Sequence, residues 1–163
     1  MQMFAQLMES VLKKLSVRED TEIKATFAKV GDGVITMTTS RAVGEQIMLT
    51  VSPVEGQTVI AEGLKEPLIL DGKGHLYTLT NQTVTLQGNL EVLECNGFSM
   101  LNGEPIFHQN QLTSLDVSGC NTLKVLNCSN NLLQSLDVSS CNTLFWLNCY
   151  DNQLPHFVSY KAS

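Results

Sequence analysis

Residues 112–132 read LTSLDVSGCNTLKVLNCSNNL, and the 21 residues that follow, 133–153, read LQSLDVSSCNTLFWLNCYDNQ. These two stretches, the first copy and the second copy, are identical at 14 positions and form an internal repeat with a period of 21 residues. A fixed period of this length is typical of repeat architectures, in which each coil buries its apolar face only against its neighbours. The carboxy-terminal half is therefore predicted to be a stack of coils.

Both copies follow the frame LxxLxCxxNxL, which is the leucine-rich repeat frame with cysteine at one of its leucine positions. An earlier coil begins at Leu90 and returns to the frame at Asn110 if residues 96–107 are an insertion. The sequence thus predicts about two and a half coils. Their inward positions are Leu90, Leu93, Cys95, Asn110 and Leu112; Leu123, Leu126, Cys128, Asn131 and Leu133; and Leu144, Leu147, Cys149, Asn152 and Leu154.

The asparagines of the frame have a structural role in this prediction. A buried amide side chain can donate to and accept from backbone groups that would otherwise lack partners. We therefore expect Asn110, Asn131 and Asn152 to form a buried ladder of hydrogen bonds between adjacent turns of the chain.

The frame places the five cysteines of the chain in two inward columns. Equivalent Cβ atoms of stacked coils lie about 4.8 Å apart, farther than the roughly 3.5–4.5 Å of a disulfide. We expect free, buried thiols that pack as small hydrophobic groups. Metal binding is the alternative, but the chain has no CxxC pair. The columns are Cys95, Cys128 and Cys149, and Cys120 and Cys141.

The amino-terminal half differs in character, since residues 1–80 contain neither cysteine nor asparagine. Residues 19–82 read as short strand candidates between turn residues, EPLIL (66–70) among them, and predict a β-rich cap or small β-sandwich. Residues 1–18 predict an amphipathic helix that docks on the domain or binds a membrane surface or partner helix. With the repeats at 83–163, the predicted fold is mainly β: a short leucine-rich-repeat solenoid of parallel β coils behind a β-sandwich-like cap and an N-terminal helix.

Charge and motifs disfavour several functions. With 16 acidic and 10 basic residues, the chain lacks the basic surface that nucleic acid requires. The chain has no run of about 18 apolar residues, so we expect no transmembrane helix. Glu9 interrupts the apolar start and lysines follow it, so we expect no signal peptide in this chain. In the absence of catalytic, phosphate-binding or metal motifs, we expect no enzyme, no cofactor and no metal site.

The residues between the inward positions face the concave side in a leucine-rich repeat. The only tryptophan, Trp146, falls there beside Phe145 and Tyr150. Exposed aromatic residues are frequent anchors of protein interfaces, which makes these three a candidate patch for a protein partner. Charged neighbours would set its electrostatic complementarity. The candidate partner-binding residues are Lys124, Asn127, Phe145, Trp146, Asn148, Tyr150, Asp151, Glu91 and Glu94.

Two alternatives stay open for this half. The alternative to binding a partner is that the aromatic residues are covered within the chain, by the 96–107 insertion or the N-terminal helix, or by a second molecule in a dimer. At the end of the chain, either Phe157 and Tyr160 fold back as a cap, or the C-terminal coil has an open edge that favours a homodimer.

The stretch LNCSNNLLQSLDVSSCNTLFWLNC (126–149) resembles the leucine-rich repeats of the internalin family of bacterial surface proteins, in particular those with 21-residue repeats and a cysteine ladder. The resemblance covers about residues 83–154. It implies protein–protein recognition, often adhesion to a host or neighbouring cell, an extracellular or cell-surface location, and no catalysis. The alternative functions are a structural spacer or self-association unit and, third, a carbohydrate-binding β-sandwich. The last is weakened because residues 22–88 offer only Phe27 and Tyr77 for stacking on a sugar.

Overall fold

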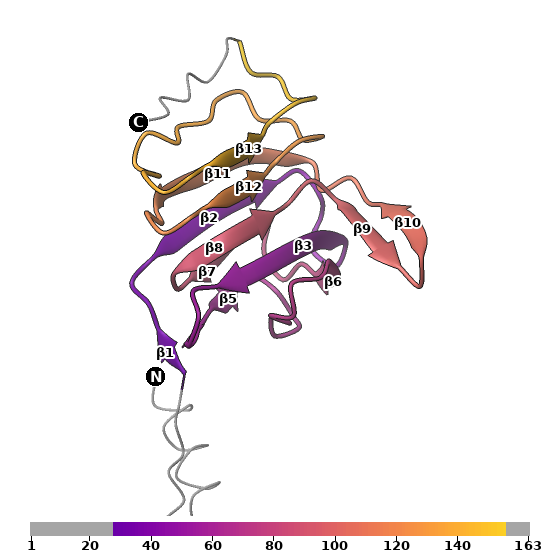
Figure 1. Cartoon of the computed structure of the whole chain (residues 1–163). Coiled ribbons are helices and arrows are strands. Elements are labelled where there is room, and N and C mark those ends of the chain that lie inside the picture. The colour runs from indigo at the N-terminus through magenta and orange to yellow at the C-terminus, as the bar shows by residue number, and fades with distance from the viewer. Residues whose placement is uncertain (1–27, 156–163) are drawn as a thin grey trace, which may run out of the picture.

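The computed structural model describes residues 28–155, and this part of the chain is built from β-strands without a helix (Figure 1). The prediction of a mainly β protein is confirmed. The amphipathic helix expected at residues 1–18 and the terminal Phe157 and Tyr160 lie outside the described residues.

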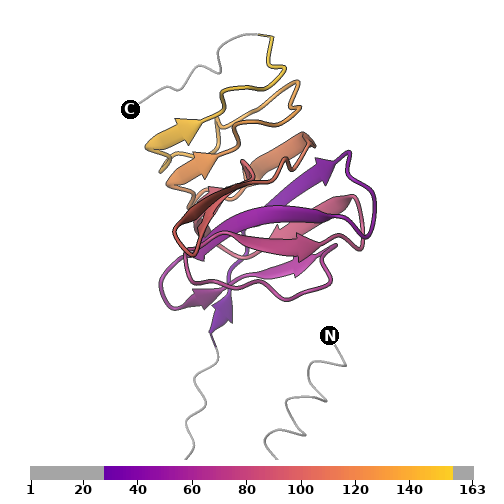
Figure 2. The same cartoon turned by 90° about the vertical axis from the view of Figure 1, so that its right-hand side faces the viewer.

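Two sheets form the body of the molecule (Figures 1 and 2). The five-stranded sheet has the order β13-β12-β8-β3-β6, and the four-stranded sheet the order β11-β2-β7-β5. The strands of the first are β3 (Gln46–Pro53), β6 (His75–Thr78), β8 (Leu90–Glu94), β12 (Val125–Asn127) and β13 (Trp146–Asn148). Those of the second are β2 (Val34–Thr39), β5 (Ile60–Glu62), β7 (Thr83–Gln87) and β11 (Leu112–Gly119).

Two short pairs of strands complete the described chain. β1 (Lys29–Val30) pairs with β4 (Gln57–Thr58) in parallel. β9 (Phe98–Leu101) and β10 (Glu104–Phe107) form an antiparallel hairpin, which occupies the segment predicted as an insertion and projects from the body (Figure 1).

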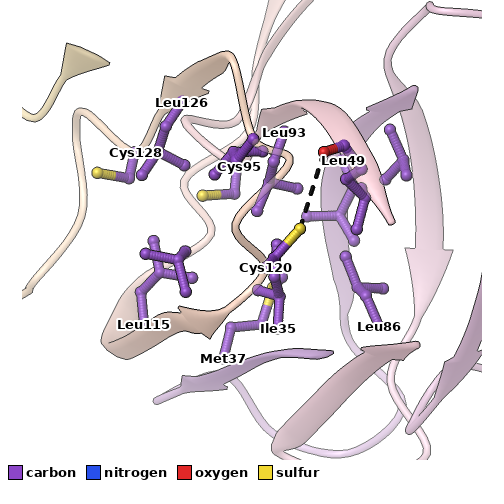
Figure 3. Close-up of a cluster of buried hydrophobic side chains, with 14 of the residues drawn as sticks. Ile35, Met37, Leu49, Leu86, Leu93, Cys95, Leu115, Cys120, Leu126 and Cys128 are labelled. Atoms are coloured by element: carbon purple, nitrogen blue, oxygen red, sulfur yellow. Dashed lines mark hydrogen bonds between the residues drawn. The ribbon is translucent and has the colours of Figure 1, made fainter. Parts of the chain in front are cut away.

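One continuous hydrophobic core lies between the two sheets. In β2 and β7 every second residue is buried, Ile35 and Met37 against Val84 and Leu86, because side chains alternate between the two faces of a strand. Leu49 and Leu93 meet them from the five-stranded sheet (Figure 3). Strands from both sides of residue 82 therefore contribute to the same core.

The strands β8, β12 and β13 run parallel and in register. Leu126 is paired with Leu93 on one side and with Leu147 on the other. These are the positions that the 21-residue frame makes equivalent once the 96–107 insertion is set aside. β3 continues this sheet in the antiparallel sense, with Val51 opposite Leu93. The edge of β8 that β12 does not occupy is thus paired with β3, a strand of the amino-terminal half.

One expected strand is absent, because EPLIL (66–70) forms an irregular segment. It contacts β6 through side chain–backbone hydrogen bonds: the Ile69 amide donates to the hydroxyl of Tyr77 (3.0 Å), and the Glu66 carboxylate accepts from the amide of Thr78 (2.7 Å). These side-chain contacts take the place of a ladder of backbone hydrogen bonds.

Candidate partner-binding face

The asparagine ladder holds the parallel strands together. The Asn131 Oδ1 accepts from the Leu112 amide (2.9 Å), and its Nδ2 donates to the carbonyls of Cys95 (3.0 Å) and Cys128 (3.1 Å). Asn152 repeats this pattern 21 residues later: its Nδ2 donates to the Cys128 (2.9 Å) and Cys149 (3.1 Å) carbonyls. Each amide thus joins the backbone of its own repeat to that of the preceding stretch.

The first rung of the ladder binds a different kind of neighbour. The Asn110 side chain is fully buried, accepts from the amide of Met48 (2.8 Å), and donates to the carbonyls of Met48 (2.7 Å) and Cys95 (3.0 Å). Because Met48 lies on β3, this asparagine connects the repeats to the antiparallel strand beside them.

All five cysteines are free thiols, and four of them are buried. Burial raises the pKa of Cys128 to about 12 and that of Cys95 well above its ordinary value. Both thiols are therefore protonated at neutral pH and unsuited to nucleophilic chemistry. The Cys120 thiol donates to the Leu90 carbonyl (3.7 Å; dashed in Figure 3), and the Cys141 thiol to the Cys120 carbonyl (3.8 Å).

The three aromatic residues singled out in the sequence lie on the outward side of the last strand and its flanks. Phe145 is 70%, Trp146 43% and Tyr150 73% exposed. In register, Trp146 stands next to Val125 on β12, which stands next to Val92 on β8. We call these three residues, Phe145, Trp146 and Tyr150, the aromatic patch. The 96–107 hairpin does not cover it, so the expectation that this insertion buries the aromatic residues is wrong.

The charged candidates divide into paired and unpaired groups. Lys124 Nζ lies 2.6 Å from Glu91 Oε1, so the one cation among the candidate residues is neutralised within the chain. Glu94, at the end of β8, is half-buried, and Asp151 is exposed beyond β13. The unpaired charge left on this face is negative.

The two asparagines among the candidates have local roles. The Asn127 Oδ1 accepts from the Ser129 hydroxyl (2.8 Å) and amide (3.3 Å), and the residue is only 9% exposed. Asn148 accepts from the amide of Tyr150 (3.2 Å) and is half-buried. Asparagine followed two residues later by such a donor is typical of an Asx turn, a signal that could have identified Asn127 as a turn residue.

The repeat frame does not identify the exposed residues of the hairpin, because residues 96–107 are an insertion in that frame. Phe98 (37%), Met100 (56%), Leu101 (57%) and Phe107 (78%) are exposed. The available signal was Asn102-Gly103 between two short apolar runs, which is the strongest short-range indication of a hairpin.

Residues 28–155 contain no group of three or more His, Cys, Asp or Glu side chains placed to hold a metal ion. The part of the chain that the structure describes also has no helix long and apolar enough to cross a membrane. Comparisons of the chain with protein families, with curated proteins and with solved structures gave no match.

Proposed function

We propose that this chain is a non-enzymatic protein-interaction module of a bacterial surface or secreted protein, and that it binds a protein partner through the outward face of β8, β12 and β13. The observation that carries the proposal is the exposure of Phe145, Trp146 and Tyr150 together at one end of the parallel strands. Large aromatic side chains bury much area at little entropic cost, which makes them frequent hot spots of interfaces.

The proposal includes a fold: a short leucine-rich-repeat solenoid of the internalin type, with the amino-terminal strands as its cap. Two observations support this interpretation. The parallel register joins Leu93, Leu126 and Leu147, and the asparagine side chains bridge successive coils at equivalent positions. In such a solenoid the outward face of the strands is the concave, binding face.

The test begins with a photo-crosslinking amino acid in place of Tyr150, in the full chain, with the same substitution at Ile60 as control. Ile60 is also exposed (49%) but belongs to β5 in the other sheet. A protein crosslinked from position 150 and not from position 60 is purified, and its affinity for the wild type and for Trp146→Ala is measured. We expect affinity to fall roughly tenfold or more. Unchanged affinity in a variant with native circular dichroism contradicts the proposal.

Self-association is a second candidate, and the open end of the sheet favours it. In the first copy Leu126 and Cys128 are fully buried, whereas their equivalents Leu147 and Cys149 in the second copy are half-buried. Within the described residues β13 has a neighbouring strand on one side only. An exposed strand edge above an apolar layer can pair with a second molecule. Sedimentation equilibrium over a wide concentration range tests this, and a protein that stays monomeric throughout contradicts it.

A further inference from the structure

The β9–β10 hairpin has two unlike faces. Its strands pair Phe98 with Phe107 and Met100 with Pro105, which places these four residues on one side. The rings of Phe98 and Phe107 are in contact, with centroids 5.1 Å apart. All four are exposed, and we call them the hairpin face. A contiguous apolar surface of this kind on a small domain marks an interaction site.

The opposite side of the hairpin packs on the body. Ser99 is half-buried and donates to the carbonyl of Gly74 (3.5 Å). A Cβ at Gly74 would meet the side chains of both Ser99 and Thr50, so these three residues lie together. Thr50 stands opposite Glu94 in register, one residue from the inward pair Val51 and Leu93, and so points outward. The hairpin therefore covers the outward side of β3.

The aromatic patch and the hairpin face consequently border the same side of the five-stranded sheet. Figure 1 shows the hairpin beyond the carboxyl end of β8, and Tyr150 follows the carboxyl end of β13. From β3 to β13 there are three strand spacings, about 14 Å in all. A standard interface of about 800 Å² per partner is roughly 30 Å across, about twice this separation.

The hairpin is held in a fixed position by contacts at its base. The His108 amide donates to the Gly97 carbonyl (2.6 Å), and the His108 Nε2 lies 2.6 Å from the Gln46 carbonyl oxygen. Gly97 has a φ of +74°, and any side chain there would collide with the His108 carbonyl. A surface fixed before binding loses little conformational entropy when a partner arrives.

The row between the two apolar surfaces is negative. Glu94 stands in register between Thr50 beneath the hairpin and Asn127, which is next to Asn148 on β13. On the strands β8, β12 and β13 and the turns on either side of them, Lys124 is the only cation, and Glu91 neutralises it. Glu94 and Asp151 remain without a cationic partner on these strands and turns.

We propose that the hairpin face and the aromatic patch bind one and the same protein segment, which presents apolar side chains to both and a lysine or arginine to Glu94 between them. This proposal rests on the proposed function, since it takes the outward face as the binding face. It adds the hairpin as a second anchor and names the chemistry of the partner.

The probe is a displayed library of random peptides of about 16 residues, which span up to roughly 50 Å when extended. Selection on the full chain is expected to enrich peptides with a basic residue between two apolar clusters. One such peptide is then titrated against the wild type, the double variant Met100→Ser/Phe107→Ser, Trp146→Ala, and Ile60→Ser as the matched exposed control. Thermal unfolding checks that each variant is folded.

We expect the double variant and Trp146→Ala each to raise the Kd about tenfold or more, and Ile60→Ser to change it by less than about twofold. Glu94→Lys is expected to weaken the peptide and to strengthen its counterpart with glutamate in the central position. Loss of binding in Trp146→Ala but not in the double variant overturns this inference and leaves the proposed function standing. Unchanged binding in both variants contradicts both proposals. If Glu94→Lys leaves the preference for the basic peptide over its glutamate counterpart unchanged, the proposed contact of Glu94 with a basic residue is overturned.

Discussion

The two copies of the repeat are nearly the same in sequence and differ in structure. LTSLDVSG (112–119) is the strand β11, because β2 pairs with it, whereas the equivalent LQSLDVSS (133–140) is irregular and has no partner strand among residues 28–155. Leu126 and Cys128 are buried, and their equivalents Leu147 and Cys149 are half-buried. Strand formation and burial in this repeat are therefore set by the neighbouring chain and not by the repeat itself.

The largest contrast is expected in the leucines that face the core. Leu126→Ala should lower the free energy of unfolding by about 3 kcal/mol, because it leaves a cavity at a fully buried site. Leu147→Ala should cost about 1.5 kcal/mol, since the half-buried site already contacts solvent. Urea denaturation measures both. Equal losses would mean that the second copy is covered as well as the first.

The asparagine ladder gives the next contrast. Asn131→Ala leaves the Leu112 amide and the Cys95 and Cys128 carbonyls without this amide partner in a buried site, and should cost about 2 kcal/mol. Asn152→Ala should cost about 1 kcal/mol, because water reaches the half-buried groups that it leaves. A cost for Asn152→Ala as large as that for Asn131→Ala, in the same denaturation assay, contradicts the comparison.

The buried thiol of Cys128, in the first copy, should make the free energy of unfolding depend on pH in the alkaline range. Burial raises the pKa of Cys128 from 9.0 to about 12, so the folded protein holds its proton where the unfolded chain releases it. Stability from this group is present below pH 9 and falls as the pH rises from 9 towards 12.

The slope should become shallower in Cys128→Ala and persist in Cys149→Ala, which keeps the buried thiol. It should not vanish in Cys128→Ala, because the pKa of Cys95 is raised too. Denaturation curves at a series of alkaline pH values measure the slopes. An identical slope in the wild type and in Cys128→Ala would remove Cys128 as its cause.

The smallest effects are expected at the outward positions, where the copies carry Lys124 and Phe145. Lys124→Ala breaks an exposed ion pair with Glu91 and Phe145→Ala removes an exposed ring, so each should change stability by less than about 0.5 kcal/mol. Thermal unfolding is the measurement. A large loss in either variant would show that the copies differ on the outward face as well as towards the core.

The sequence predicted those parts of the fold that recur. The 21-residue period places Leu126 between Leu93 and Leu147, and it predicts which asparagines bridge the coils. It carries no signal for pairings that occur once, such as β3 beside β8 or β2 beside β11, because antiparallel partners distant in the chain share no periodicity. EPLIL (66–70) has the composition of a strand, but it contacts β6 through two side chain–backbone hydrogen bonds instead of a backbone ladder.

The candidate face was predictable in part for the same reason. The frame identifies outward positions, and Phe145, Trp146 and Tyr150 are exposed there. It does not report contacts within the chain, so neither the pairing of Lys124 with Glu91 nor the burial of Asn127 could be read from it. The hairpin residues lie outside the frame, and the Asn102-Gly103 pair is the sequence signal that indicates the turn between their strands.

The close approach of Gly97 to His108 has a consequence for how this protein can change. Because the two ends of the hairpin meet there through a backbone hydrogen bond, the chain leaves the repeat and re-enters it at almost the same point. Asn110 then donates to the Cys95 carbonyl, as Asn131 does from the following repeat. A hairpin of another length or sequence could be grafted onto this junction without shifting the register of the repeats, so the surface it presents can diversify while the scaffold stays the same.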